Sequence, residues 1–242
     1  MPWGSPNRHQ ALQQGALALV DYPLTLVGDA DFQGFWRCDL LTTDGSTISR
    51  IDDRTGHGRH ATQALTLSQP NYDTVNFMQP SAGFTGGPYL GVSTALAAAM
   101  AADGWTTWTV FACADIGQAF EFIITIGTAT GWSLTIESSA LVMRSTGVGS
   151  ATDSAADTDA HLLLVTRSGG IIHIYLDGVE QSVASSNVGV SAPTGISALG
   201  AFTSGVFPFI GWGFEWGVFS RALTSGERAS LAMYVPRWYM FT

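Results

Sequence analysis

HLLLVTRSGGIIHIYLDG, residues 161–178, is the stretch that decides the fold class of this chain. Two apolar runs of strand-forming residues flank Gly169-Gly170, a pair that favours a tight turn. Asp177-Gly178 is a second turn signal, and it marks where the next strand begins. The stretch therefore predicts an antiparallel β-hairpin that continues into a further strand.

A second block of the same kind follows at residues 211–223, which read GWGFEWGVFSRAL. The alternation of glycine with aromatic residues predicts a long strand that carries one acid, Glu215. Thr224 and Glu227 have the spacing of a helix capping box, and apolar residues follow at helical intervals. A helix is therefore expected to close the domain.

Short strands separated by turn residues are predicted through most of the chain. They cover residues 108–114, 120–127, 132–137, 140–144, 162–167, 171–176, 181–184, 195–200 and 209–219. The alanine-rich run 95–102 favours a short helix capped by Ser93 or Thr94, and residues 40–69 suit a long ordered loop. The pattern predicts an all-β, two-sheet antiparallel jelly-roll sandwich with one or two short helices.

The order of these pieces resembles a LamG-like domain of the concanavalin A-like lectin and glucanase superfamily. Upstream, Trp36, the DGS of residues 44–46 and the DDRTGHGRHA of residues 52–61 resemble the opening of that family. Gly86-Gly87-Pro88-Tyr89-Leu90 and the strand at 108–114 resemble its first core strands. The resemblance implies a jelly roll over residues 32–235 in which Glu215 is a structural, hydrogen-bonding acid. Binding modules, enzymes and virion proteins all share this fold.

Three regions are expected along the chain: an arm over residues 1–30, a jelly-roll domain over 31–235 and an aromatic tail over 236–242. Apolar arms and aromatic tails dock on their own domain or on a neighbouring subunit, and the sequence does not separate the two. The residues expected to make partner contacts are Trp3, Leu17, Leu19, Val20, Trp238, Tyr239 and Phe241.

The charge content is low for a soluble domain. The ten basic residues are all arginine, and they stand against nineteen acids. Charged residues make up 12% of the chain, where about 25% is usual. A weakly charged surface favours contact with other subunits, although a Ser/Thr/Gly-rich monomer also fits. A net charge of −9 without a basic cluster argues against nucleic acid as a partner.

The N-terminal residues do not resemble an export signal. The apolar run at residues 15–20 stops at Asp21, which makes it shorter than the core of a signal peptide. No apolar run is long enough to cross a bilayer, so no membrane partner is expected. These N-terminal residues are consistent with a protein that is made and folded in a cytoplasm. Such a protein is expected to assemble into a virion inside a bacterial host.

The acids do not form the pattern that glycoside hydrolysis requires. Such enzymes need two carboxylates that face the scissile bond, and on a strand these stand at alternate positions. None of the five glutamates, Glu121, Glu137, Glu180, Glu215 and Glu227, has an acid two or four residues away. No Gly-x-Ser-x-Gly motif occurs either, and Cys38 and Cys113 fit buried strand positions better than a nucleophile or a disulfide. No catalytic residues are therefore predicted.

Metal binding has only weak candidates. His57 and His60 lie three apart in an Asp- and Arg-rich loop, where a solvated loop explains them better than a metal site does. Calcium is held by loop carboxylates and carbonyls in many sandwiches, but acids are also ordinary turn residues. No cofactor is predicted, and the weak calcium candidates are Asp29, Asp31, Asp52, Asp53, Asp153, Asp157 and Asp159.

One strand carries the aromatic residues that would serve a sugar. Trp212, Phe214 and Trp216 stand at alternate positions, so they are expected to line one face of their strand. That face either binds a sugar or belongs to the hydrophobic core. The glycines between them share the opposite parity, so bare backbone there would let another chain approach closely.

These observations together predict a non-enzymatic structural protein of a bacteriophage virion. Capsid decoration and a tail fibre or spike both remain open. Its expected partners are other virion proteins and copies of itself, which makes it a homo-oligomer, with adhesion to a host surface glycan as a further role. The alternative is a carbohydrate-binding lectin module that recognises a bacterial surface glycan. A glycoside hydrolase is a remote third alternative, because the fold permits it.

Overall fold

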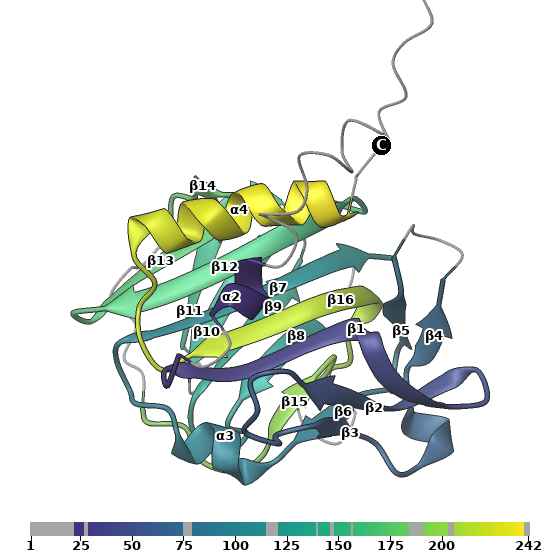
Figure 1. The fold of residues 1–242 in the computed structure, drawn as a ribbon. Coiled ribbons are helices and arrows are strands. Elements are labelled where there is room, and N and C mark those ends of the chain that lie inside the picture. The colour runs from purple at the N-terminus through teal and green to yellow at the C-terminus, as the bar shows by residue number, and fades with distance from the viewer. Residues whose placement is uncertain are drawn as a thin grey trace, which may run out of the picture.

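The structure is a computed structural model, and it describes residues 22–26, 29–74, 79–114, 121–138, 140–145, 148–155, 157–183, 191–202 and 206–239. Sixteen strands form one continuous hydrogen-bonded path that rolls into two stacked layers (Figure 1). Apart from one isolated bridge, the strand pairs are antiparallel. The predicted all-β jelly-roll class is confirmed.

The first sheet holds the strands that the sequence marks most clearly. Its order is β14 (Val179–Glu180), β13 (Ile171–Leu176), β12 (Ala160–Ser168), β7 (Trp105–Cys113), β16 (Ile210–Phe219) and β1 (Phe32–Asp44). The early part of β16 also pairs with β5 (Ser81–Thr85). The hairpin predicted at residues 161–178 is therefore the β12–β13 pair, in which Ser168 stands opposite Ile171.

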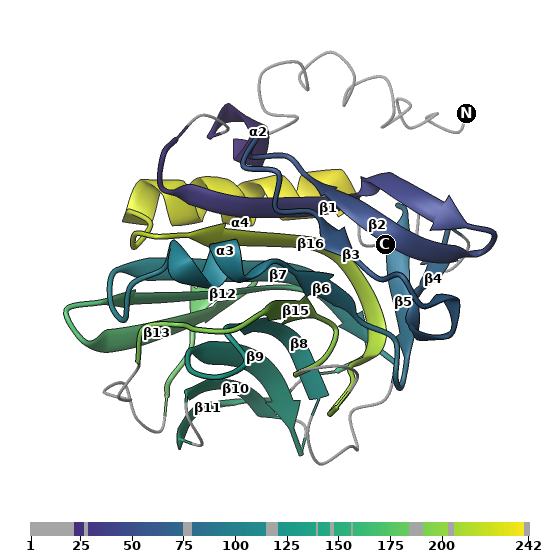
Figure 2. The ribbon, with the colours of Figure 1, turned by 90° about the horizontal axis from the view of Figure 1, so that it is seen from below.

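The second sheet packs beneath the first, as Figure 2 shows. Its order is β11 (Val148–Ala155), β10 (Ala140–Ser145), β9 (Trp132–Glu137), β8 (Glu121–Ile126), β15 (Ser197–Leu199), β6 (Leu90–Val92) and β3 (Ala61–Thr62). Strand β2 (Thr47–Asp53) pairs with β1, with β3 and with β4 (Asn71–Asp73), so it joins the two layers. The described helices are α2 (Tyr22–Thr25), α3 (Thr94–Ala98) and α4 (Ser225–Tyr239), with a 3-10 turn η2 (Thr66–Ser68).

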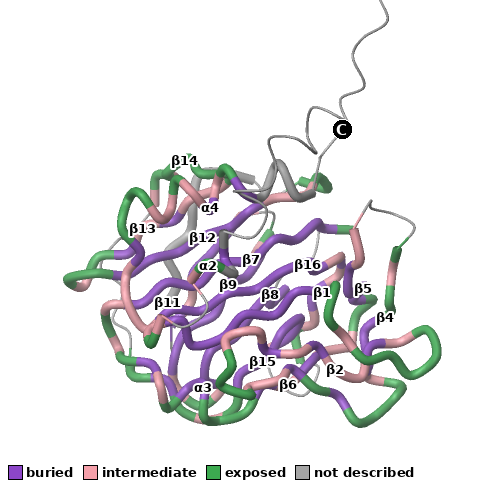
Figure 3. Tube along the Cα trace, in the orientation of Figure 1, coloured by how far each residue is buried: buried purple, intermediate pink, exposed green. Residues whose placement is uncertain are grey.

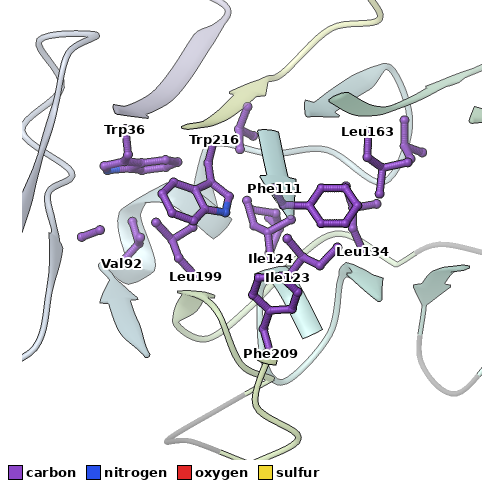
Figure 4. Close-up of a cluster of buried hydrophobic side chains, with 14 of the residues drawn as sticks. Trp36, Val92, Phe111, Ile123, Ile124, Leu134, Leu163, Leu199, Phe209 and Trp216 are labelled. Atoms are coloured by element: carbon purple, nitrogen blue, oxygen red, sulfur yellow. The ribbon is translucent and has the colours of Figure 1, made fainter. Parts of the chain in front are cut away.

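The core lies between the two sheets. Trp36 and Trp216 from the first sheet meet Val92 and Leu199 from the second (Figure 4), and Trp105 stacks on the indole of Trp132 with ring centroids 4.1 Å apart. The buried residues follow the central strands of both layers (Figure 3). Burying side chains of this size supplies most of the free energy of folding.

A separate apolar layer lies between the first sheet and α4. It is built from residues on the outer face of the sheet and from the apolar side of the helix: Phe32, Phe35, Trp108, Phe214, Leu231 and Tyr234. Thr224 and Glu227 bond reciprocally at the start of α4, which confirms the predicted capping box. The described helices include none that is both long and apolar enough to span a bilayer.

A β-bulge in β16 overturns the expected parity of its aromatic residues. The pairing with β7 shifts between Gly213 and Glu215, so one extra residue enters β16 there. Phe214 therefore packs under α4, whereas Trp216 points into the core between the sheets. The three aromatic residues do not share one face, because a bulge reverses the alternation of side chains.

The glycines of β16 are covered by the protein's own indoles. A methyl group at Gly213 would overlap the ring of Trp216, and one at Gly217 would overlap the ring of Trp108. The bare backbone was expected to admit another chain, but here it admits two tryptophans of the same chain. Glycine at these positions serves internal packing.

Several local predictions differ from the structure. The strand expected at residues 181–184 is replaced by β14 at residues 179–180, and β11 was not predicted. Residues 40–69 are not one long loop, because β1 runs to Asp44 and β2 follows after a tight turn in which Gly45 has φ of +67°. The helix α3 ends at Ala98 instead of residue 102. Helix α4 continues through Pro236 to Tyr239, so the start of the expected tail at residues 236–242 is helical.

Candidate functional site

Glu215 belongs to a buried polar network and not to a catalytic pair. Its side chain is fully buried in β16, and Arg37 stands directly opposite it in β1. The hydroxyl of Tyr234 in α4 donates to Glu215 at 2.9 Å and accepts from Arg37 at 3.0 Å. Burial and the charge of Glu215 raise the pKa of Tyr234, so this phenol stays protonated. The network ties α4 to the first sheet, as the resemblance implies for a structural acid.

Asp29 and Asp31, two of the calcium candidates, hold a cation of the protein itself. The guanidinium of Arg221 lies 2.6 Å from the Asp29 carboxylate and 3.7 Å from that of Asp31. The hydrogen bond from Arg221 lowers the pKa of Asp29. Ser220 also donates its hydroxyl to Asp31 at 3.1 Å. These acids anchor the start of β1 to the end of β16.

Asp52 and Asp53 order the loop that follows β2. The carboxylate of Asp53 accepts hydrogen bonds from the backbone N–H groups of Phe35, Thr55 and Arg59 at 3.0–3.3 Å. Asp52 lies 2.9 Å from His60 and 2.5 Å from Arg50. Backbone N–H groups, Arg50 and His60 contact these oxygens, so the two acids serve to order the loop.

The remaining acidic candidates lie around His161 at the start of β12. Its two ring nitrogens lie 2.7 Å from Asp177 and 2.8 Å from Asp157. These two hydrogen bonds raise the pKa of His161 to about 9. The backbone N–H of Asp159 donates to Asp157, while the side chain of Asp153 lies outside the described residues. The histidine is a cationic link between two carboxylates.

The described residues contain no group of three or more His, Cys, Asp or Glu side chains that could hold a metal ion. Cys38 and Cys113 are buried free thiols, as expected, and burial raises the pKa of Cys113 to about 12. Of the partner contacts expected in the arm and tail, Trp3, Leu17, Leu19, Val20 and Phe241 lie outside the described residues. Trp238 and Tyr239 lie in the last turn of α4.

A candidate site is a cavity of about 310 Å³ on the outer face of the second sheet, the face that points away from the core. We call it the outer-face cavity. The turn at residues 127–131 forms one wall, Phe122, Phe202 and Phe207 form another, and Trp132, Ser133 and Arg144 complete the lining. It lies on the opposite side of the sandwich from α4, which covers the first sheet (Figure 2).

The aromatic wall combines exposure with an uncommon backbone conformation. Phe122 packs against Phe202 at 5.1 Å and against Phe207 at 5.8 Å between ring centroids. Phe207 is 48% exposed and has φ of +52°, a left-handed conformation that bulky residues rarely adopt. A large apolar side chain exposed to water on a left-handed backbone makes this surface a candidate for binding.

The polar floor of the cavity follows from strand register. Thr125, Ser133 and Arg144 stand opposite one another on β8, β9 and β10, and each points to the outer face. Ser133 donates its hydroxyl to Thr125 at 3.1 Å, and Thr125 donates to a backbone carbonyl at 3.2 Å. Thr125 is fully buried and supports Ser133 from below, so the polar lining itself consists of Thr128, Thr130, Ser133 and Arg144.

Arg144 is held in place by Glu137 on the neighbouring strand. The guanidinium makes two hydrogen bonds to the carboxylate, through Nε and Nη2. Glu137 also accepts from Thr135 at 2.8 Å. Arg144 stands opposite Ser133, which lies four residues before Glu137 along β9. The side chain of Arg144 therefore passes over the buried pair Thr135 and Val142 to reach Glu137. This ion pair closes one side of the cavity.

This cavity was not predicted from the sequence. Its aromatic residues come from three separate segments of the chain. The tryptophans, which are the more conspicuous aromatic residues in the sequence, are mostly buried in the core. The usable signal was the alternation of Thr125, Ser133 and Thr135 with large apolar residues, which places hydroxyls on an outward face. Their burial and their neighbours depend on pairing between distant segments.

No protein family model matches the sequence, and no curated protein matches it. Solved structures share the fold. A Trypanosoma rangeli sialidase matches over 84% of this chain and 33% of its own, with 14% identity and a TM-score of 0.59. The binding domain of botulinum neurotoxin DC matches over 84% and 51%, with 11% identity and a TM-score of 0.57.

A structure of botulinum neurotoxin type C, described through its interaction with two ganglioside molecules, matches over 78% of this chain and 51% of its own. Its identity is 12% and its TM-score 0.56. The chain therefore spans about a third to a half of the structures it resembles. At these identities the likeness establishes a shared all-β fold.

Proposed function

We propose that this protein is a non-enzymatic glycan-binding module that binds sugar in the outer-face cavity. The observation that carries the proposal is the exposed ring of Phe207 above a floor of hydroxyls. Sugars bind to aromatic faces through their C–H groups and to a few directed polar groups, and this wall and floor supply both. The volume is at the lower end of the range for ligand sites, about 300–1,000 Å³, which suits a short glycan segment.

The chemistry of the lining supports binding without catalysis. None of the described residues that line the cavity is a carboxylate, and Glu137 behind it is paired with Arg144. Glycoside hydrolysis needs a proton donor and a second carboxylate across the scissile bond. The shared fold with a sialidase and with a toxin domain described with gangliosides supports a sugar-related role.

Replacing Phe207 by alanine is expected to weaken glycan binding about tenfold, because an aromatic contact of this kind contributes about 1 kcal/mol beyond its buried area. A glycan array identifies the ligand, and titration calorimetry with the best oligosaccharide measures the change. Met233→Ala is the matched control, since Met233 is 52% exposed on α4 and lies away from the cavity. Equal affinities for both variants and the parent would place the sugar elsewhere. A protein that binds no glycan would overturn the proposal.

We further propose that this module belongs to a bacteriophage virion, made in the host cytoplasm and assembled there with copies of itself or other virion proteins. A second apolar surface supports this assembly role. Leu67 is 99% exposed and Leu65 is 68% exposed in and beside η2, close to the β1–β2 turn, where Thr66 bonds to Asp44. Leucines held in water on an ordered turn favour burial against another subunit.

The double variant Leu65→Ser/Leu67→Ser is expected to convert an oligomer into a monomer, because it removes the apolar contact. Light scattering on the full chain measures the mass of each form. Val179→Ser is the control, since Val179 is 64% exposed on the far edge strand β14. A parent protein that is already monomeric at high concentration would overturn self-assembly through this surface.

A further inference from the structure

We propose that the outer-face cavity selects an acidic sugar, one that carries a carboxylate, and that Arg144 binds that carboxylate. The inference rests on the proposed function, that the cavity binds glycan. Arg144 is the one charged side chain among the described residues that line the cavity, and the rest of the lining is aromatic, hydroxyl-bearing, glycine or alanine. A guanidinium carries five N–H donors and a delocalised positive charge, so Arg144 can bridge Glu137 and a ligand carboxylate, whereas a neutral sugar offers no charge to match.

The position of Arg144 in the sheet directs its charge toward the cavity. It stands on β10 opposite Ser133 and on the same face as Phe122. The side chain of Arg144 is 27% exposed, whereas that of its partner Glu137 is 14% exposed. The cation therefore lies nearer to the solvent than the carboxylate that holds it.

The ion pair also fixes the guanidinium before any ligand arrives. An arginine on the surface loses side-chain entropy when it is immobilised, and here the two hydrogen bonds to Glu137 have already restricted it. A preorganised donor binds more tightly than a mobile one, because less freedom is lost on binding. In this arrangement the ring of Phe207 packs against the sugar ring, while Arg144 binds the carboxylate of the sugar.

The net negative charge of the whole protein opposes binding of an acidic sugar everywhere except close to a cation. The chain has a net charge of −9, so an anionic glycan is repelled by most of the surface. An acidic sugar is therefore favoured only where a cation is presented within a cavity that also fits the ring. Other arginines of the described chain, such as Arg50 and Arg221, sit in ion pairs away from this lining.

The test compares matched pairs of oligosaccharides that differ only in charge. One arm uses a hexuronate oligosaccharide and its carboxyl-reduced product, and a second uses a sialylated oligosaccharide and its methyl ester. Calorimetry on the full chain at low and high salt is expected to show about tenfold tighter binding of the acidic member of at least one pair. The preference is expected to shrink at high salt, where exposed charges are screened.

Two variants assign that preference to Arg144. Arg144→Gln is expected to remove the tenfold difference while binding of the neutral member persists. The double variant Glu137→Gln/Arg144→Gln leaves no unpaired charge, and it is expected to give the same loss in a protein with unaltered thermal stability. Arg50→Gln, which removes another ion-paired arginine away from the cavity, is expected to keep the preference.

The outcomes separate this inference from the proposed function. Equal binding of acidic and neutral members would overturn the acidic selection and leave a glycan-binding module in place. A preference that survives in the double variant would also overturn it, because the cation would then lie elsewhere. Absence of binding to either member of both pairs, and to the glycan array, would overturn the proposed function together with the inference.

Discussion

Replacing Glu215 by alanine is expected to lower the free energy of unfolding by about 3 kcal/mol, because removing a buried charged acceptor leaves a buried hydrogen-bond donor unsatisfied. The side chain is fully buried, and its neighbours Arg37 and Tyr234 are 4% and 3% exposed. Without the carboxylate, the Tyr234 hydroxyl loses its acceptor, and the guanidinium of Arg37 loses the negative charge opposite it. Urea unfolding followed by tryptophan fluorescence measures the change.

A matched variant separates burial from the loss of a glutamate. Glu180 also pairs with a neighbour, His173, but its side chain is 54% exposed, so Glu180→Ala is expected to change stability by less than about 0.5 kcal/mol. Tyr234→Phe removes one hydrogen bond of the same network and is expected to cost about 1–3 kcal/mol. If Glu215→Ala unfolds at the same urea concentration as the parent, α4 does not depend on the buried network.

Raising the pH from 6.5 to 9 is expected to destabilise the protein by about 2 kcal/mol through His161. The folded protein raises the pKa of this histidine from 6.5 to about 9, mainly through its hydrogen bond to Asp177 and also through Asp157. The folded state therefore holds the proton more tightly than the unfolded state. The stabilisation is complete below pH 6.5, declines as the pH rises and is absent above about pH 9.

The expected loss of stability is smaller than the full pKa shift of His161 corresponds to. Asp157 and Asp177 are both about half exposed, so water and salt screen their interaction with the histidine. Thermal unfolding at a series of pH values measures the effect. His161→Gln is expected to flatten the profile over this range. His57→Gln, in an exposed loop, is expected to leave it unchanged. A parent protein equally stable at pH 6.5 and pH 9 would contradict the expectation.

Local sequence patterns predict about half of the described strands correctly. The β12–β13 hairpin, the long strand β16 and the capping box of α4 are each set by residues within a few positions of one another. The alternation of side chains and the turn glycines carry enough information, because register in a hairpin is fixed by its turn. The fold class follows from these elements.

The longer strands were harder to predict where polar residues interrupt them. β1 extends to Asp44 and pairs with β2 through residues that look like a loop in isolation. The bulge at Phe214 was also missed, because it depends on how β16 fits against β7. Pairing between distant segments overrides local preference in both cases.

The sequence by itself determined the all-β class and the low charge, since each depends on composition or on neighbouring residues. Only the tertiary structure decided that Glu215 is a buried link to α4 and that Gly213 and Gly217 hold indoles. It also decided that Phe122, Phe202 and Phe207 meet above Arg144. These contacts join segments far apart in the chain, and their geometry is set by sheet register and close packing, which no local pattern records.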